Sequence, residues 1–188
     1  MGQWFQTIVD PEAELEEAEA LAARVVDFLA DRGIILPSRT DCVLGVRGGY
    51  PPGPNVGEAL ADPANRFGFE SLSTNGLDVV VGRSLFDAGQ GGVTLTCSRC
   101  GNAVDSLQSA DWEWADAIWE WYEGPGPGNL ACLKCGFVQP ITDWQFDPPW
   151  GFGNLGFKFW NWPSLSETFI QEIGGLLGHR TIYNYGKL

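Results

Sequence analysis

Four of the five cysteines in this chain occur in two copies of one motif, C-x-x-C-G. The two copies consist of Cys97, Cys100 and Gly101, and of Cys132, Cys135 and Gly136. In such a motif the backbone turns so that both sulfurs face one point, and glycine permits the positive φ that closes the turn. Four converging thiolates form a tetrahedron, which is the geometry that zinc accepts. The sequence therefore predicts one structural zinc ion, with all four cysteines as its ligands.

Residues 92–140 resemble the zinc-ribbon class of metal modules, because a predicted strand precedes each cysteine pair. The 31 residues between the pairs, positions 101–131, exceed the roughly 15–20 of a compact ribbon, and the extra length contains a predicted helix. The resemblance implies a structural metal and no particular activity. A four-thiolate site leaves no coordination position for water, which disfavours a catalytic metal. A rubredoxin-like iron site and metal-free redox thiols remain as alternatives.

The overall charge disfavours two classes of partner. The chain of 188 residues carries 24 acidic and 11 basic side chains, for a net charge of −13, and no basic cluster is present. A charge of this sign repels nucleic-acid phosphates and anionic lipid headgroups. We expect no nucleic acid and no membrane as partners, whereas a basic protein would suit an acidic surface.

The N-terminal sequence lacks the basic and apolar segments of a signal peptide, and no apolar run approaches the roughly 20 residues of a membrane span. These features predict a cytoplasmic protein whose thiols stay reduced, so that paired cysteines bind metal rather than form disulfides. A composition rich in Ala, Gly, Pro and Arg and poor in Lys suggests a bacterial source.

The N-terminal end of the chain has a β-α-β pattern. Residues 4–9 are predicted to form a strand, and Asp10 is the expected N-cap of a helix with Pro11 in its first turn. Apolar residues then recur at spacings of three and four until Gly33, the predicted end of the helix. Residues 34–36 form a short apolar run, which predicts a second strand.

The C-terminal end repeats this plan. Residues 156–162 are a predicted strand, Ser164 and Glu167 match a capping box, and the following helix is expected to stop at Gly178 before a strand at 181–185. The predicted fold class is α+β, with two terminal β-α-β units packed as an α/β sandwich. A ferredoxin-like arrangement is one way for the units to share a sheet with right-handed crossovers. Strands are also expected at 77–81 and 93–96. The 44% hydrophobic content suits one globular domain over residues 1–188, with the 92–140 ribbon as an insertion.

An acidic, tryptophan-rich helix is predicted between the cysteine pairs, over residues 109–124, with Ser109 as its cap and Asp111 in its first turn. At 100° per residue, one arc is apolar and consists of Trp114, Ala115, Ile118, Trp119, Trp121 and Tyr122. The opposite arc carries the candidate partner-binding residues Glu113, Asp116, Glu120 and Glu123. A wide apolar arc usually packs inside the protein. The alternative is that this helix presents aromatic anchors and carboxylates to a partner.

Few residues qualify for catalysis. Cys42 is a nucleophile candidate only if His179, the single histidine, serves as its base, and a buried structural cysteine is the simpler interpretation. The G-x-G-x-x-G match at 151–156 is rejected as a dinucleotide site, because a predicted strand follows it where a helix is required. No catalytic residues are predicted.

Three functions remain open at this level. The first is a non-catalytic, zinc-stabilised protein-interaction module of the inhibitor, immunity or adaptor type. The second is a nucleic-acid-associated zinc-ribbon protein, although only Arg99 and Lys134 lie within the motifs. The third is an enzyme of unfamiliar type that uses carboxylates or Cys42.

Overall fold

A computed structural model describes residues 2–45, 48–66, 68–108 and 112–188. The chain divides into two compact units, Met1–Gly89 with Gly151–Leu188, and Gln90–Trp150. The predicted insertion of residues 92–140 lies inside the second unit, which is longer at both ends. One globular domain over residues 1–188 stays a prediction. Within the described ranges, no helix has the length and apolarity needed to cross a membrane.

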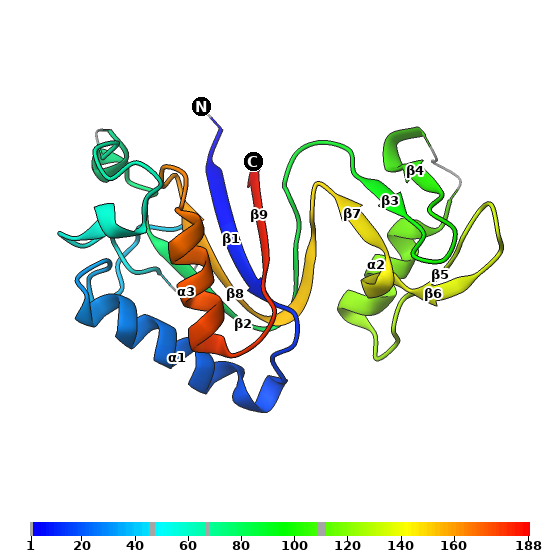
Figure 1. The fold of residues 1–188 in the computed structure, drawn as a ribbon, viewed down its shortest axis with the longest axis horizontal. Helices are drawn as coiled ribbons and strands as arrows, with labels where there is room; N and C mark the ends of the chain where they lie inside the picture. The colour runs from blue at the N-terminus through cyan, green and yellow to red at the C-terminus, as the bar shows by residue number, and fades with distance from the viewer. Residues whose placement is uncertain (1, 46–47, 67, 109–111) are drawn as a thin grey trace. The chain divides into compact units, whose positions relative to one another are not determined.

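The first unit is built on a four-stranded sheet of order β2-β8-β1-β9 (Figure 1). Its strands are β1 (Trp4–Asp10), β2 (Leu77–Phe86), β8 (Gly151–Trp160) and β9 (Ile182–Lys187). Each neighbouring pair is antiparallel. Strands β1 and β2 therefore run parallel with β8 between them, and β8 and β9 run parallel with β1 between them. The helices of these two connections are α1 (Leu15–Asp31) and α3 (Glu167–Leu177). The mixed α and β class predicted from the sequence is confirmed.

The second strand of the N-terminal β-α-β unit is not where the sequence predicted it. Ile35 makes only an isolated bridge to Pro52, and residues 34–36 form no strand. Ile34 and Ile35 are fully buried in the core beside the helices. Their apolar character therefore reflects burial of a loop, and β2 supplies the strand.

The core of this unit lies between the helices and one face of the sheet. Successive strand residues point to opposite faces, and the face that includes Ile8, Phe157 and Phe159 packs against α1 and α3 (Figure 1). The opposite face carries Phe5 and Trp160, which pair across β1 and β8. Cys42 and Val43 pack on these two rings and bury them.

Both helices begin later than the sequence predicted. Helix α1 has Glu14 as its N-cap, and the backbone N–H of Glu14 donates to the carboxylate of Glu17. Asp10 instead stabilises the preceding turn, because its Oδ1 accepts from the backbone N–H groups of residues 12 and 13. In α3 the cap is Ser166 rather than Ser164. The predicted stop at Gly178 is confirmed, with φ of 77°.

The glycines at 151–156 lie within β8, so the rejection of a dinucleotide fingerprint is confirmed. Gly156 lies directly beneath the ring of Phe86, where a Cβ atom would collide with it. The glycines here permit close packing in a sheet.

The described residues of the second unit form two small sheets and one α-helix. A three-stranded sheet of order β4-β3-β7 is formed by β3 (Thr94–Thr96), β4 (Ala103–Asp105) and β7 (Gln145–Asp147). A hairpin is formed by β5 (Asn129–Ala131) and β6 (Val138–Pro140), and the helix is α2 (Trp114–Glu123). Short 3₁₀ turns occur in the two units at Val56–Ala59, Phe69–Ser71, Ser106–Gln108 and Ile141–Asp143.

Candidate metal centre

The two cysteine motifs form the tips of two hairpins with the same backbone geometry. In the first, the N–H of Cys97 donates to the carbonyl of Asn102, and the N–H of Gly101 donates back to the carbonyl of Cys97, both at 2.9 Å. The second hairpin repeats these bonds from Cys132 to Phe137 and from Gly136 to Cys132. Gly101 and Gly136 share a φ of 68°. The predicted role of glycine in closing each turn is thereby confirmed.

The four sulfurs converge on one point. Sγ of Cys97 lies 4.0 Å from Sγ of Cys135, and Sγ of Cys100 lies 3.7 Å from Sγ of Cys132. All four sulfurs lie within 4.8 Å of one another. A regular tetrahedron with metal–sulfur bonds of about 2.3 Å requires sulfur–sulfur separations of about 3.8 Å. The cluster therefore has the dimensions of a four-thiolate metal site.

Backbone amides favour negative charge at this cluster. The N–H of Cys135, and next that of Lys134, donate to the Cys132 sulfur and lower its pKa to about 6. At Cys100 the N–H of Asn102 acts in the same direction, but burial and the neighbouring cysteines raise the pKa to about 11. Four thiols this close resist losing all their protons without a cation. Metal binding is then coupled to proton release.

Side chains beside the cysteines link the two hairpins. The hydroxyl of Ser98 donates to Oε1 of Gln139 at 2.5 Å. The guanidinium of Arg99 lies 4.9 Å from the ring centroid of Phe137. Arg99 is thus paired with a ring of the opposite hairpin, and both links hold the cysteine pairs together.

Helix α2 packs through a narrower face than the sequence predicted. Ala117, Ile118 and Trp121 are buried, at the spacing of three and four expected for one helix face. Trp114 is half-buried and its ring lies against that of Trp150. The predicted helix ends at Gly124 as expected. Its proposed cap Ser109 and first-turn Asp111 lie outside the described residues.

The remaining members of the predicted apolar arc point to solvent. Trp119 is 61% exposed and Tyr122 is 43% exposed, and Ala115 is also exposed. The rings of Trp119 and Tyr122 stack with centroids 6.0 Å apart. The four candidate acidic residues are also exposed, with Asp116, Glu120 and Glu123 in the same helix and Glu113 at its N-cap. We call Trp119, Tyr122 and these four acids the α2 surface.

The structure does not bring Cys42 and His179 together. Cys42 is buried against Phe5 and Trp160. His179 pairs with Asp10, at the opposite end of β1 and on the other face of the sheet. The two residues therefore form no dyad in the structure, and the prediction that Cys42 is buried is confirmed.

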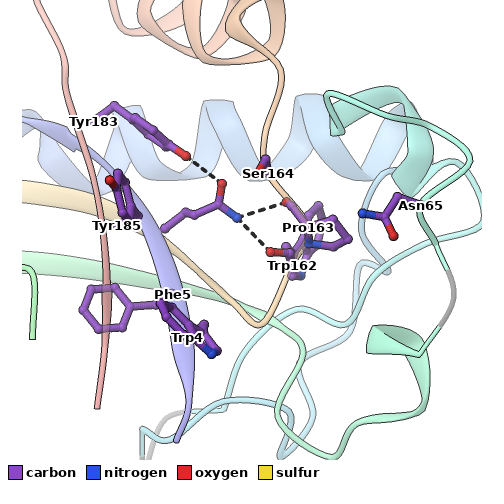
Figure 2. Close-up of a pocket in the computed structure, with 9 residues that line it drawn as sticks. Trp4, Phe5, Asn65, Trp162, Pro163, Ser164, Tyr183 and Tyr185 are labelled. Carbon is purple, nitrogen blue, oxygen red and sulfur yellow. Dashed lines mark hydrogen bonds between the residues drawn. The ribbon is translucent and has the colours of Figure 1, made fainter.

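A cavity in the first unit was not predicted from the sequence. Its volume is about 440 Å³, and its wall includes Trp4, Gln6, Asn65, Ser164 and Tyr185 (Figure 2). These residues come from separate segments of the chain that only the folded sheet brings together. No local sequence motif predicts that these residues form a cavity.

Comparisons with family models, with curated proteins and with solved structures find no match to this chain.

Proposed function

We propose that this protein is a non-catalytic, zinc-stabilised interaction module, of the inhibitor, immunity or adaptor type, that acts in the cytoplasm of a bacterium. Its partner is a basic protein that docks on the α2 surface. The cysteine cluster supports the zinc ion, and the exposed side chains of α2 support the partner.

The proposed metal is zinc and its role is structural. Four cysteine sulfurs at tetrahedral separations are the donor set typical of structural zinc sites. Such a site has no open position for water or substrate. The module of residues 92–140 would then be a zinc ribbon, enlarged by α2. The strands of the second unit are only three residues long, so the metal would supply cohesion that these short sheets lack.

The proposed fold of the first unit is ferredoxin-like. The support is the sheet order β2-β8-β1-β9 together with two β-α-β connections, each of which spans one intervening strand. In this plan the second unit is inserted in the connection from β2 to β8.

The single observation that carries the interaction proposal is the exposed, stacked pair of Trp119 and Tyr122. Large aromatic side chains are enriched in the energetic centres of protein interfaces. The same helix exposes the adjacent arc of carboxylates, in a chain of net charge −13. An aromatic pair beside a row of acids suits a basic partner, since complementary charge accelerates and orients docking.

The test is capture of the partner by the tagged full-length chain in its native cells, followed by binding of the two purified proteins. We expect Trp119→Ala to weaken the affinity at least tenfold. Leu107→Ala is the matched control, because Leu107 is 74% exposed in the same unit, and it should leave affinity unchanged.

A second pair of variants isolates the charge. Glu120→Gln with Glu123→Gln should slow association and reduce its salt dependence. Glu16→Gln with Glu19→Gln, an exposed pair on α1, removes the same charge elsewhere and should have little effect. A partner that binds equally well to all four variants contradicts the proposed surface.

A further inference from the structure

The cavity of the first unit lies on the helix-facing side of the sheet, where β1 begins and β9 approaches its end (Figure 2). Its volume of about 440 Å³ falls within the range of small-molecule sites. Two aromatic side chains, Trp4 and Tyr185, form one part of its wall. They are diagonal neighbours across β1 and β9, because Gln6 pairs with Tyr185 and Trp4 pairs with Lys187. Trp4 is 55% exposed and Tyr185 is 64% exposed, so both rings are accessible.

The floor of the cavity is fixed by one buried amide. Nε2 of Gln6 donates to the carbonyls of Trp162 and Pro163 at 2.8 and 3.0 Å. Its Oε1 accepts from the hydroxyl of Tyr183 at 2.6 Å and from the N–H of Leu165 at 2.9 Å. All four hydrogen bonds that this amide can make are present. The protein alone therefore holds the floor in place, and Figure 2 draws the bonds of this amide to Trp162, Pro163 and Tyr183 as dashed lines.

Polar groups of the cavity remain able to bind a ligand. The hydroxyl of Tyr183 is neutral at physiological pH, since burial, and next the neighbouring Tyr185, raise its pKa further above the ordinary value of about 10. Its proton points to Gln6, which leaves an oxygen lone pair as an acceptor. Within the described part of the chain, the side-chain amide of Asn65 and the hydroxyl of Ser164 make no hydrogen bond. Donors and acceptors are thus both available.

The wall carries no formal charge. None of the described residues that line the cavity is Asp, Glu, Lys or Arg. Nucleotides are disfavoured, since no described lining residue is cationic, the ammonium of Lys187 beside Trp4 would offset at most one phosphate charge, and the chain has a net charge of −13. A cationic ligand is disfavoured as well, because no carboxylate lines the wall and the ammonium of Lys187 already lies 5.1 Å from the Trp4 ring. The remaining ligand class is neutral and rich in hydroxyl groups.

We infer that this cavity binds a neutral carbohydrate. One face of a sugar ring presents polarised C–H groups, which are attracted to the negative faces of aromatic rings such as Trp4 and Tyr185. Each sugar hydroxyl both donates and accepts hydrogen bonds. Asn65, Ser164 and the oxygen of Tyr183 offer the matching groups. This site is distinct from the α2 surface and does not depend on it.

The test uses the full-length protein and a panel of glucose, galactose, mannose, N-acetylglucosamine and their oligomers. Ligand-observed NMR should detect saturable binding of at least one sugar, and calorimetry should give its Kd. Trp4→Ala should weaken that Kd about tenfold, in line with the loss of one aromatic contact. Asn65→Ala, an exposed loop substitution that should not affect folding, should weaken it several-fold. Trp119→Ala is the matched control and should leave it unchanged.

Three outcomes overturn the inference. The first is no saturable binding of any sugar up to about 10 mM, a concentration that detects even weak sites. The second is sugar binding that is unaffected by Trp4→Ala and by Asn65→Ala, which would place the sugar elsewhere. The third is that a proline-rich peptide or a free nucleobase binds in the cavity and the sugars do not. In that case Trp4→Ala and Asn65→Ala would weaken the affinity for the peptide or the nucleobase.

Discussion

Nδ1 of His179 lies 2.9 Å from Oδ2 of Asp10, a carboxylate that is fully buried. This contact joins the turn after α3 to the end of β1 and so ties the two β-α-β connections together. The hydrogen bond with Asp10 raises the pKa of His179 above its usual value, against a smaller effect of burial. The negative charges of Glu17, which lies 4.0 Å from Nε2, and of Glu12 also raise the pKa of His179.

The first prediction concerns pH. The pKa of His179 is higher in the folded protein than in the unfolded protein, where it is about 6.5. Protonated His179 therefore stabilises the fold, and this contribution is fully present at pH values below about 6.5. That contribution is lost as pH rises through the folded pKa. His179→Asn keeps a donor but does not titrate. The difference in unfolding free energy between wild type and this variant should therefore decrease above about pH 6.5, as measured by urea denaturation. A difference that is constant with pH would contradict this role for His179.

The second prediction concerns the two faces of α2. Ile118→Ala and Trp121→Ala remove buried side chains and should each reduce stability by about 2–5 kcal/mol. Trp119→Ala and Tyr122→Ala remove exposed rings and should change stability by about 0.5 kcal/mol or less. Trp114→Ala should fall between, because Trp114 is half-buried. Chemical denaturation monitored by fluorescence measures all five variants. Equal losses on both faces would mean that Trp119 and Tyr122 also support the fold.

The third prediction concerns the acidic residues of α2. Changing Glu113, Asp116, Glu120 and Glu123 together to Gln should barely alter the melting temperature, since exposed charges contribute little to stability. A large drop in melting temperature would show that these carboxylates have a structural role, and would weaken their assignment to a partner.

The fourth prediction concerns Gly156. A methyl group at this position would collide with the ring of Phe86, so Gly156→Ala should destabilise the protein by about 1–3 kcal/mol. Gly175→Ala is the matched control, because Gly175 is exposed in α3 with open space around its Cα. This control should be neutral or stabilising by up to about 1 kcal/mol, as alanine favours helix. Thermal melts of the two variants decide the point, and an unchanged Gly156→Ala melt would contradict it.

The sequence predicted the elements whose patterns are local. The helices α1 and α3 have apolar residues at helical spacing, and the cysteine motifs specify their own turns. The wrong strand at 34–36 arose because a buried loop and a buried strand have the same short apolar run. Strand β2 was expected only over 77–81, since Gly82 interrupts the apolar run, within the register shift between Val81 and Ser84. Its pairing with β8 depends on residues more than sixty positions away.

The faces of α2 show a second limit of sequence reasoning. Six apolar residues form a broad arc of the helix, but the elements packed against α2 bury only part of that arc. Periodicity alone does not tell which aromatic residues remain exposed, because that depends on the size of the adjoining sheet and turn. The cavity lined by Trp4, Gln6 and Tyr185 was missed for a similar reason, since register across β1 and β9 brings its wall together.

The central claim is that Cys97, Cys100, Cys132 and Cys135 hold one zinc ion that stabilises the second unit. Elemental analysis of the purified protein, with a melt of each sample, tests it most directly. We expect about one zinc per chain in the wild type and in Cys42→Ala, whose thiol lies outside the cluster. Cys97→Ser and Cys132→Ser should lose the metal and melt at a lower temperature. A well-folded wild-type protein with no bound zinc, or serine variants that melt like the wild type, would contradict the account.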